Sequence, residues 1–215
     1  MKKSASEKNV PLLQHDEGFL SRGFKSLAGV DEVGRGPLAG PVVASAVIVR
    51  DFLFSSRIND SKKMTSAARE TAYEEILTKC TVGIAVIEAE EIDTINIFQA
   101  SLKAMRDAVI KLGVLPDALL VDGPKGLEIS VRQFPIIDGD AKSFAIACAS
   151  IVAKVTRDRM MDYYDGIYPQ YGFSRHKGYG TSEHMEALKA QGPCKIHRQS
   201  FEPVRVLSRA DFINL

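Results

Sequence analysis

Two adjacent carboxylates inside an apolar segment constrain this chain more than any other feature. Asp31 and Glu32 lie within Leu27–Val33, which otherwise has the character of a buried strand. An ionised carboxylate in such a segment is unstable unless a positive partner compensates for its burial. The nearest basic residue in sequence, Arg35, comes after the strand. Because neighbouring strand residues point to opposite faces, the strand must bend or end here if both carboxylates bind one cation.

Two further acidic residues follow apolar segments later in the chain. Asp122 begins an Asp-Gly-Pro turn, and Asp140 precedes a predicted helix. Taken singly, Asp122 is typical of a turn residue and Asp140 of a helix cap. Taken with the earlier pair, they offer the oxygen ligands that hard divalent cations such as Mg²⁺ and Mn²⁺ prefer. The four carboxylates therefore predict a metal site.

A glycine-rich turn, Gly34-Arg35-Gly36-Pro37, follows the acidic pair. Its two glycines allow a ligand to approach the backbone closely, and Arg35 is suited to meet a phosphate. The turn matches neither a Walker A loop nor a dinucleotide-binding fingerprint, and a strand rather than a helix comes next. It is therefore either a plain turn between two strands or a loop that contacts a ligand.

Hydrophobic periodicity predicts an α/β fold with a mixed five-stranded sheet flanked by helices. Residues 1–26 are expected to form an N-terminal extension outside the sheet, with Pro11 and Gly23 as breakers and with room for a short helix. Residues 27–215 are expected to form one domain, which includes a small C-terminal helical lobe from about residue 170. The expected strands are 27–33, 41–49, 82–87, 118–121 and 134–137, and the expected helices are 67–80, 95–112, 143–161, 182–190 and 207–213.

Composition narrows the class of protein only slightly. The 28 Lys and Arg residues nearly balance 27 Asp and Glu, so any surface that binds nucleic acid must be local. No apolar segment follows Lys2 and Lys3, so a signal peptide is not expected, and no segment approaches the length of a membrane span. The three widely spaced cysteines argue against a disulfide framework and against structural zinc.

Several segments together resemble the ribonuclease HII family. The run Gly29-Val-Asp-Glu-Val-Gly-Arg-Gly-Pro-Leu-Ala-Gly-Pro-Val42 is similar to the family signature. Further similar segments occur in the family's order, and the resemblance covers roughly residues 27–204: they are 60–64, 91–96, 121–123, 139–140, 149–158 and 176–181.

This resemblance implies a ribonuclease H fold with Asp31, Glu32, Asp122 and Asp140 as catalytic, metal-binding carboxylates. It implies that the backbone of Gly34, Arg35 and Gly36 contacts the ribose 2′-hydroxyl at the cleavage site. Tyr179 is implied to stack on the neighbouring sugar and to sense that this sugar lacks a 2′-hydroxyl. The 2′-hydroxyl is also the group that distinguishes RNA from DNA locally.

The implied activity is endonucleolytic hydrolysis on the 5′ side of ribonucleotides, which leaves 3′-hydroxyl and 5′-phosphate ends. Two divalent ions, Mn²⁺ or Mg²⁺, are expected during catalysis. The expected substrates are RNA–DNA hybrids and DNA duplexes with embedded ribonucleotides, as in ribonucleotide excision repair. We expect a cytoplasmic monomer with no membrane association.

Basic residues outside the glycine-rich turn are candidates for phosphate contacts. Lys62 and Lys63 either bind substrate or form an ordinary solvated pair. Residues 175–205 contain six Lys or Arg and three Glu. This positive net charge is typical of a lobe that contacts phosphates. The histidines of this region lack a metal-ligand spacing, which favours surface or hydrogen-bonding roles. Lys154 and Arg157 are expected to partner nearby carboxylates.

Two rival functions fit parts of the pattern. One is a nuclease of the same fold that acts on all-DNA structures, which the Gly-Arg-Gly loop and Tyr179 argue against. The other is a non-catalytic module that binds hybrids. Clustered carboxylates disfavour it, because phosphate binding gains nothing from negative charge.

Overall fold

The computed structural model describes residues 5–210, which fall into two compact units. Unit 1 comprises residues up to 33, 44–85 and 102–155, and unit 2 comprises 34–43, 86–101 and residues from 156 onward. The division expected from the sequence, with boundaries after 26 and near 170, stays a proposal.

A mixed sheet of five strands, flanked by helices, forms the framework, as predicted. Strand β4 runs parallel to both β1 and β5. The strands lie side by side in the order β3-β2-β1-β4-β5, with bounds β1 Leu27–Val33, β2 Val42–Val49, β3 Cys80–Ile87, β4 Ala118–Asp122 and β5 Arg132–Ile136.

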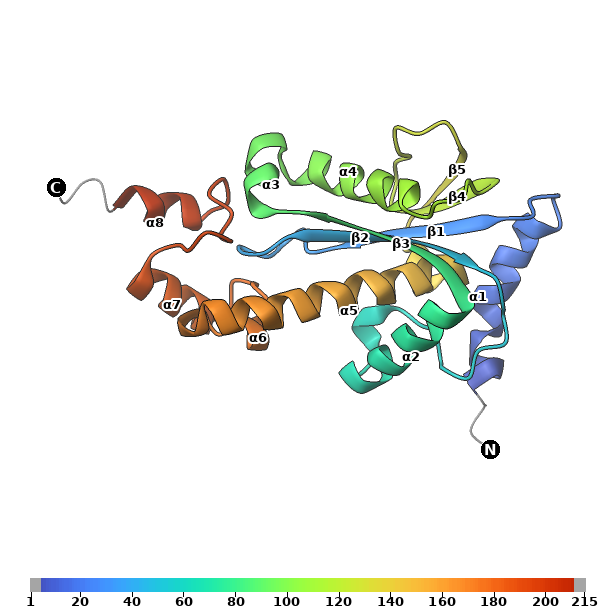
Figure 1. Ribbon diagram of the computed structural model, residues 1–215, viewed down its shortest axis with the longest axis horizontal. Coiled ribbons are helices and arrows are strands. Elements are labelled where there is room, and N and C mark those ends of the chain that lie inside the picture. The colour runs from blue at the N-terminus through green and yellow to red at the C-terminus, as the bar shows by residue number, and fades with distance from the viewer. Residues whose placement is uncertain (1–4, 211–215) are drawn as a thin grey trace. The chain divides into compact units, whose positions relative to one another are not determined.

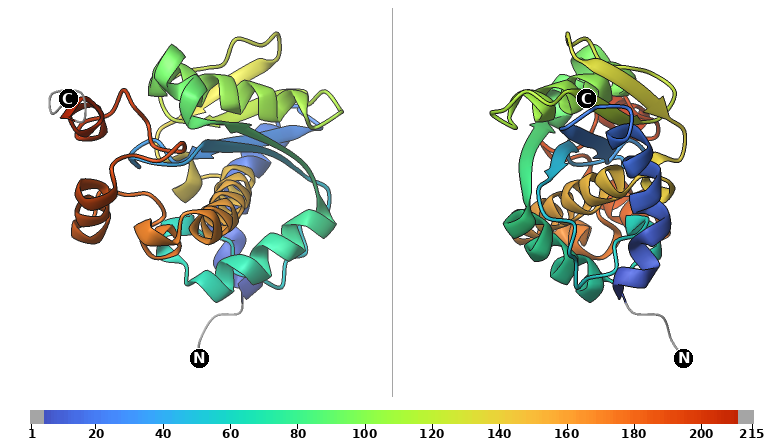
Figure 2. Two further views of the ribbon diagram at one scale, coloured as in Figure 1. Left: turned by 60° about the vertical axis from the view of Figure 1, so that its left-hand side comes forward. Right: turned by 90° about the vertical axis from the view of Figure 1, so that its right-hand side faces the viewer.

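Helices cover both faces of the sheet, with α4 (Ile97–Ile110) on one face and α5 (Phe144–Ile167) on the other (Figure 1, Figure 2). Two glycines permit this close packing. A Cβ added to Gly29 of β1 would lie 2.0 Å from the backbone carbon of Ala145 in α5. A Cβ added to Gly83 of β3 would lie 2.1 Å from the carbonyl oxygen of Ala108 in α4. No side chain fits at either contact.

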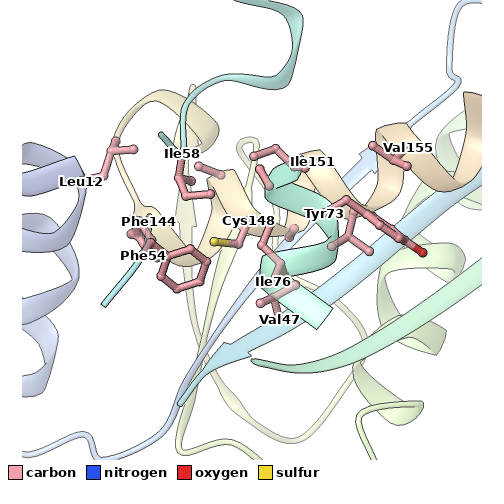
Figure 3. Close-up of a cluster of buried hydrophobic side chains, with 14 residues drawn as sticks. Leu12, Val47, Phe54, Ile58, Tyr73, Ile76, Phe144, Cys148, Ile151 and Val155 are labelled. Carbon is pink, nitrogen blue, oxygen red and sulfur yellow. The ribbon is translucent and has the colours of Figure 1, made fainter. Parts of the chain in front are cut away.

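The main hydrophobic core lies between β2, α2 (Ser66–Lys79) and α5, with α1 (Ala5–Leu20) at its end (Figure 3). The cysteines are free thiols, and burial raises the pKa of Cys80 to about 12. The members of this core other than alanine are Leu12, Val47, Phe54, Ile58, Tyr73, Ile76, Phe144, Cys148, Ile151, Val152 and Val155.

The N-terminal segment contains a 16-residue helix, α1, that continues through Pro11. The prediction that Pro11 would break the segment was wrong, because tertiary contacts hold the helix. The side-chain amide of Asn9 donates to the carbonyl oxygen of Ser56 (3.0 Å) and accepts from the N–H of Ile58 (2.9 Å). The carboxylate of Asp16 accepts from the N–H of Ala145 (2.9 Å), in the first turn of α5.

The helix expected over 95–112 corresponds to α4, and a short helix that was not predicted, α3 (Ala89–Ile95), precedes it. Asn96 separates them with φ of 67°, a left-handed conformation that asparagine tolerates better than most residues. Its side-chain oxygen accepts hydrogen bonds from the N–H groups of Phe98 (3.0 Å) and Gln99 (3.1 Å). Asn96 therefore caps α4, and hydrophobic periodicity alone does not reveal such a cap.

Unit 2 contains short helices around a small core of its own. Ala39, Met161, Tyr171, Phe173 and Ile196 form this core. Besides α3, unit 2 contains the helices that follow α5, which are η3 Pro169–Tyr171, α6 Phe173–His176, α7 Ser182–Gln191 and α8 Val204–Ala210. The last expected helix, 207–213, thus begins earlier than predicted, and its final residues lie outside the described part of the chain. Within residues 5–210, no helix has the length and apolar character needed to cross a membrane.

Candidate active site

Three carboxylates converge where strands β1 and β4 end. Val30 pairs with Val121 in the parallel register of these strands, so the next residues, Asp31 and Asp122, lie side by side. Asp31, Glu32 and Asp122 each offer one oxygen, and these oxygens all lie within 4.8 Å of one another. The side chain of Asp122 is held by the N–H of Gly139, which donates to it over 2.7 Å.

Asp31 is the most deeply placed of the three, with 6% of its surface exposed. Burial raises its pKa well above the ordinary value, and the negative charges of Glu32 and Asp122 raise it further. Hydrogen bonds from the Ser150 hydroxyl and from the N–H of Glu32 (2.7 Å) oppose this rise. Such a cluster repels itself, and a divalent cation with oxygen ligands would neutralise it.

Asp140 lies in the 3-10 helix η2 (Gly139–Ala141) and is not one of the three converging carboxylates. It is nevertheless close enough to interact electrostatically with the site. Partial burial raises its pKa, as do the charges of Asp60 and Asp122, whereas the charge of Lys62 opposes the rise. Asp140 therefore stands at the edge of the carboxylate cluster.

The two lysines of η1 (Ser61–Lys63) have different surroundings. Partial burial lowers the pKa of Lys62, but the carboxylates of Asp140, Asp31, Asp60 and Asp122 outweigh this effect and raise it. Lys63 instead forms an ion pair with Asp60 (3.1 Å), and its side chain is 66% exposed. Lys62 is thus the cation that faces the carboxylates.

A buried guanidinium in unit 2 holds the glycine-rich loop, which comprises the Gly34–Pro37 turn and the residues up to Pro41. Arg198, fully buried, donates to the carbonyl oxygens of Gly34, Arg35 (2.9 Å) and Gly40 (2.9 Å). Burial, and then the positive charge of Arg157, lowers the pKa of Arg198 to about 9. In the sequence, Arg198 is recognisable only as one basic residue of the C-terminal lobe, because nothing there shows that its partners are backbone carbonyls.

Arg157, also fully buried, supports the same loop from α5. Its guanidinium donates to the carbonyl oxygens of Pro41 (2.9 Å), Ala39 (3.1 Å) and Lys177 (3.0 Å). Arg157 was expected to partner a carboxylate, and its hydrogen bonds instead go to these backbone oxygens. A planar guanidinium has five donors, which suits it to satisfy several carbonyls at once.

Tyr179 lies beside the glycine-rich loop within unit 2. A Cβ added to Gly36 would lie 3.7 Å from Cε1 of the Tyr179 ring. The ring is 41% exposed, whereas its backbone is anchored on both sides. Its N–H donates to the carbonyl of His176 (3.0 Å), and its own carbonyl lies 2.9 Å from Nδ1 of His184. The carboxylates and both lysines belong to unit 1, and the loop and Tyr179 to unit 2.

Two serines that the sequence analysis did not single out support the carboxylates. The hydroxyls of Ser61 and Ser150 are hydrogen-bonded to each other over 2.9 Å, and Ser150 also hydrogen-bonds Asp31. Both serines lie inside segments that carry the family resemblance, at 60–64 and 149–158. Their position in those segments was the available signal.

Comparison with known proteins gives a consistent result. A relative named ribonuclease HII from Acetivibrio thermocellus is 54% identical over 188 residues, which are 87% of this chain and 73% of that protein. Ribonuclease HII of Bacillus subtilis is 49% identical over 211 residues, covering 95% of this chain and 82% of the relative.

Solved structures with the same fold include the ribonuclease H2 of Pyrococcus horikoshii OT3. It is 25% identical with a TM-score of 0.73, covering 86% of this chain and 98% of that one. The ribonuclease HII of Archaeoglobus fulgidus, solved as a complex with PCNA, is 26% identical with a TM-score of 0.71, covering 82% and 95% of the two chains. The family model for ribonuclease HII matches residues 28–204. The chain therefore belongs to the ribonuclease HII family, whose members are ribonuclease H endonucleases and hydrolases.

Proposed function

We propose that the protein hydrolyses the phosphodiester bond on the 5′ side of a ribonucleotide and leaves 3′-hydroxyl and 5′-phosphate ends. Its substrates are RNA–DNA hybrids and DNA duplexes with embedded ribonucleotides. The observation that carries the proposal is the convergence of Asp31, Glu32 and Asp122 within 4.8 Å at neighbouring strand ends. Asp140, beside them, completes the proposed set of four catalytic carboxylates.

We assign Mg²⁺ or Mn²⁺ ions to these four residues. The donor set fits, because carboxylate oxygens are the ligands that such hard cations take. Burial raises the pKa of Asp31 most, and the charges of Glu32 and Asp122 raise it further; a bound cation would relieve this repulsion. When bound, a pair of such ions supplies Lewis acidity at the attacking water and at the leaving 3′-oxygen. Lys62, which faces the carboxylates, is assigned to the negatively charged phosphate, and the exposed Lys63 to a more distant one.

The glycine-rich loop is assigned to the ribose. In a trans peptide, the carbonyl and the following N–H point in opposite directions. Because Arg198 binds the carbonyls of Gly34 and Arg35, the N–H groups of Arg35 and Gly36 are directed away from that guanidinium. Backbone groups turned outward in this way can hydrogen-bond a 2′-hydroxyl without reading the base.

The partly exposed ring of Tyr179 is assigned to the sugar next to the cleavage site. An aromatic face that packs on a deoxyribose loses contact when a 2′-hydroxyl intrudes, which gives a preference for RNA–DNA junctions. A cytoplasmic location, a monomeric state and a part in removing ribonucleotides from DNA are proposed on the strength of the family match.

The test is cleavage of a duplex with one embedded ribonucleotide, compared with its all-DNA counterpart and with a continuous hybrid. We expect cleavage that needs Mg²⁺ or Mn²⁺, stops with a chelator, and yields a 3′-end that a polymerase extends. Equal cleavage of the all-DNA duplex would instead assign the protein to the DNA nucleases of this fold. Tight binding of the hybrid without strand scission in either metal would assign it to the binding modules.

A further inference from the structure

Three histidines of unit 2 are buried and form a hydrogen-bonded cluster that the proposed chemistry does not use. Nε2 of His184 lies 3.0 Å from Nε2 of His197. Nδ1 of His197 lies 3.0 Å from the backbone nitrogen of Cys194 and 3.1 Å from its sulfur. The ring of His176 stacks on that of His184, with centroids 4.5 Å apart. The side chains form a chain rather than surround one point, so they are not arranged as a metal site.

The partners fix which nitrogen of each ring carries a proton. The carbonyl of Tyr179 only accepts hydrogen bonds, so Nδ1 of His184 is the protonated nitrogen of a neutral ring. Nε2 of His184 therefore accepts, and Nε2 of His197 donates to it. Nδ1 of His197 then accepts from the N–H of Cys194. Each of these donors therefore has an acceptor, and the series of hydrogen bonds runs from Cys194 through the two histidines to Tyr179.

This series of hydrogen bonds ends at the backbone of Tyr179, the residue assigned to the sugar. The carbonyl of Tyr179 receives two hydrogen bonds, from His184 and from the N–H of Thr181 (2.8 Å). His176 adds a second support, since its carbonyl accepts from the N–H of Tyr179 and its Nδ1 accepts from the N–H of Gly178 (3.2 Å). His184 and His197 are fully or almost fully buried, whereas the Tyr179 ring is 41% exposed. The buried histidines thus hold the backbone of a residue whose side chain is partly exposed.

We propose that His184, oriented by His197, is a positioning residue that holds Tyr179 in the orientation needed to distinguish a deoxyribose from a ribose beside the cleavage site. This inference rests on the sugar-reading role proposed for Tyr179. His184 touches neither substrate nor the carboxylates in this assignment, and it acts through one backbone hydrogen bond. Its loss therefore changes the preference between substrates more than the chemical step itself.

The test measures kcat/KM on two duplexes, one whose single ribonucleotide is followed by DNA and one whose ribonucleotide lies within a continuous RNA strand. The preference is the ratio of the two values. His184→Leu removes the donor to Tyr179, and His184→Asn restores an N–H donor near the position of Nδ1. We expect His184→Leu to reduce the preference about fivefold, the effect of one hydrogen bond, and His184→Asn to retain most of it.

A double-mutant comparison separates positioning from a general loss of stability. In a Tyr179→Ala background, His184→Leu should leave the preference unchanged, because no ring remains to be positioned. Tyr171→Phe is the matched control, since it removes a hydrogen bond to the Gly192 carbonyl (2.6 Å) in the same core without touching Tyr179. We expect it to leave the preference unchanged.

Each outcome has a distinct meaning. A folded His184→Leu protein with the wild-type preference overturns the positioning role, as does an equal loss of preference in Tyr171→Phe. If Tyr179→Ala itself keeps the wild-type preference, the sugar-reading role fails instead. Should thermal unfolding show that His184→Leu does not fold, His197→Leu against His197→Gln makes the same comparison one residue further along the chain, and an unchanged preference in both overturns the proposal.

Discussion

The guanidinium of Arg157 fills the space that a side chain at Gly34 would need. A Cβ added to Gly34 would lie 2.4 Å from Nε of Arg157 and 2.6 Å from the carbonyl oxygen of Pro41. Gly34 also has φ of 98°, a conformation that other residues rarely adopt. Loop geometry and arginine position therefore depend on each other.

Gly34→Ala should consequently destabilise the protein by about 3 kcal/mol, combining backbone strain with overpacking. Denaturant unfolding measures this change. Gly36→Ala is the matched control, because its Cβ would make only an ordinary contact with the Tyr179 ring at 3.7 Å. We expect the control to change the free energy of unfolding by about 0.5 kcal/mol or less. Equal effects of the two substitutions would contradict the tight fit of Arg157 against Gly34.

Asp122→Asn should abolish most metal-dependent cleavage while leaving the fold intact. The amide has no charge to offer a cation, but its oxygen can still accept from the N–H of Gly139, as the carboxylate does over 2.7 Å. We expect turnover to fall by at least about a hundredfold, or 2.7 kcal/mol of transition-state stabilisation. The measurements are cleavage of the single-ribonucleotide duplex and thermal unfolding without metal. Turnover at the wild-type level would rule out Asp122 as a ligand.

Lys62→Met should reduce kcat/KM on a hybrid about tenfold, which corresponds to 1.4 kcal/mol. Its ammonium group interacts with the active-site carboxylates, and its removal leaves their negative charge to repel a phosphate. Lys63→Met is the control, since Lys63 pairs with Asp60 and is mostly exposed. We expect a smaller loss for Lys63→Met, largest at low salt. The reverse order of the two losses would show that η1 presents Lys63 instead.

Asp16→Ala should lower the free energy of unfolding by about 1–2 kcal/mol, because it removes a cap from the first turn of α5. Glu17→Ala changes an exposed carboxylate on the same helix and should have little effect. Urea unfolding of both variants measures the difference. If the two substitutions proved equally mild, the attachment of α1 to α5 would not contribute to stability.

Acid should destabilise the protein through its buried histidines. Burial, followed by the proximity of His184, lowers the pKa of His197 to about 4 from an ordinary value of 6.5. Between these values the unfolded chain binds the extra proton, so stability falls as the pH falls, by up to about 1.4 kcal/mol per pH unit. Unfolding measured from pH 7 to 4 should show this slope, and His197→Gln should flatten it. An unchanged slope in the variant would mean that other groups dominate.

Much of the sheet was predictable from local sequence. Strand β1 was predicted with the observed bounds, and the other four within a few residues, because short apolar runs bounded by polar or turn-forming residues are typical of strands. Which strands pair with each other was not predictable in the same way. The meeting of Asp31 with Asp122 depends on β1 and β4 lying parallel and adjacent, and neither segment carries a signal for its partner.

Helix caps and buried hydrogen bonds are the features that sequence patterns did not predict. The start of α4 depends on Asn96, whose side chain caps the helix, and hydrophobic periodicity does not mark such a cap. Arg198 binds the backbone carbonyl of Gly40, 158 positions away. Because every residue has such a carbonyl, the sequence does not show which one an arginine will bind. The absence of a metal-ligand spacing favoured either surface or hydrogen-bonding histidines, and only the structure shows that His184 and His197 are buried and hydrogen-bonded to each other.

The cap that Asp16 places on α5 joins positions 129 residues apart. During synthesis α1 leaves the ribosome long before its partner Ala145 is made. A 16-residue helix with an internal proline is not stable in water by itself. The N-terminal segment must therefore wait unfolded for α5. Refolding should be slowed by this late closure, and fusions that hold the N-terminus away from α5 should yield less folded protein.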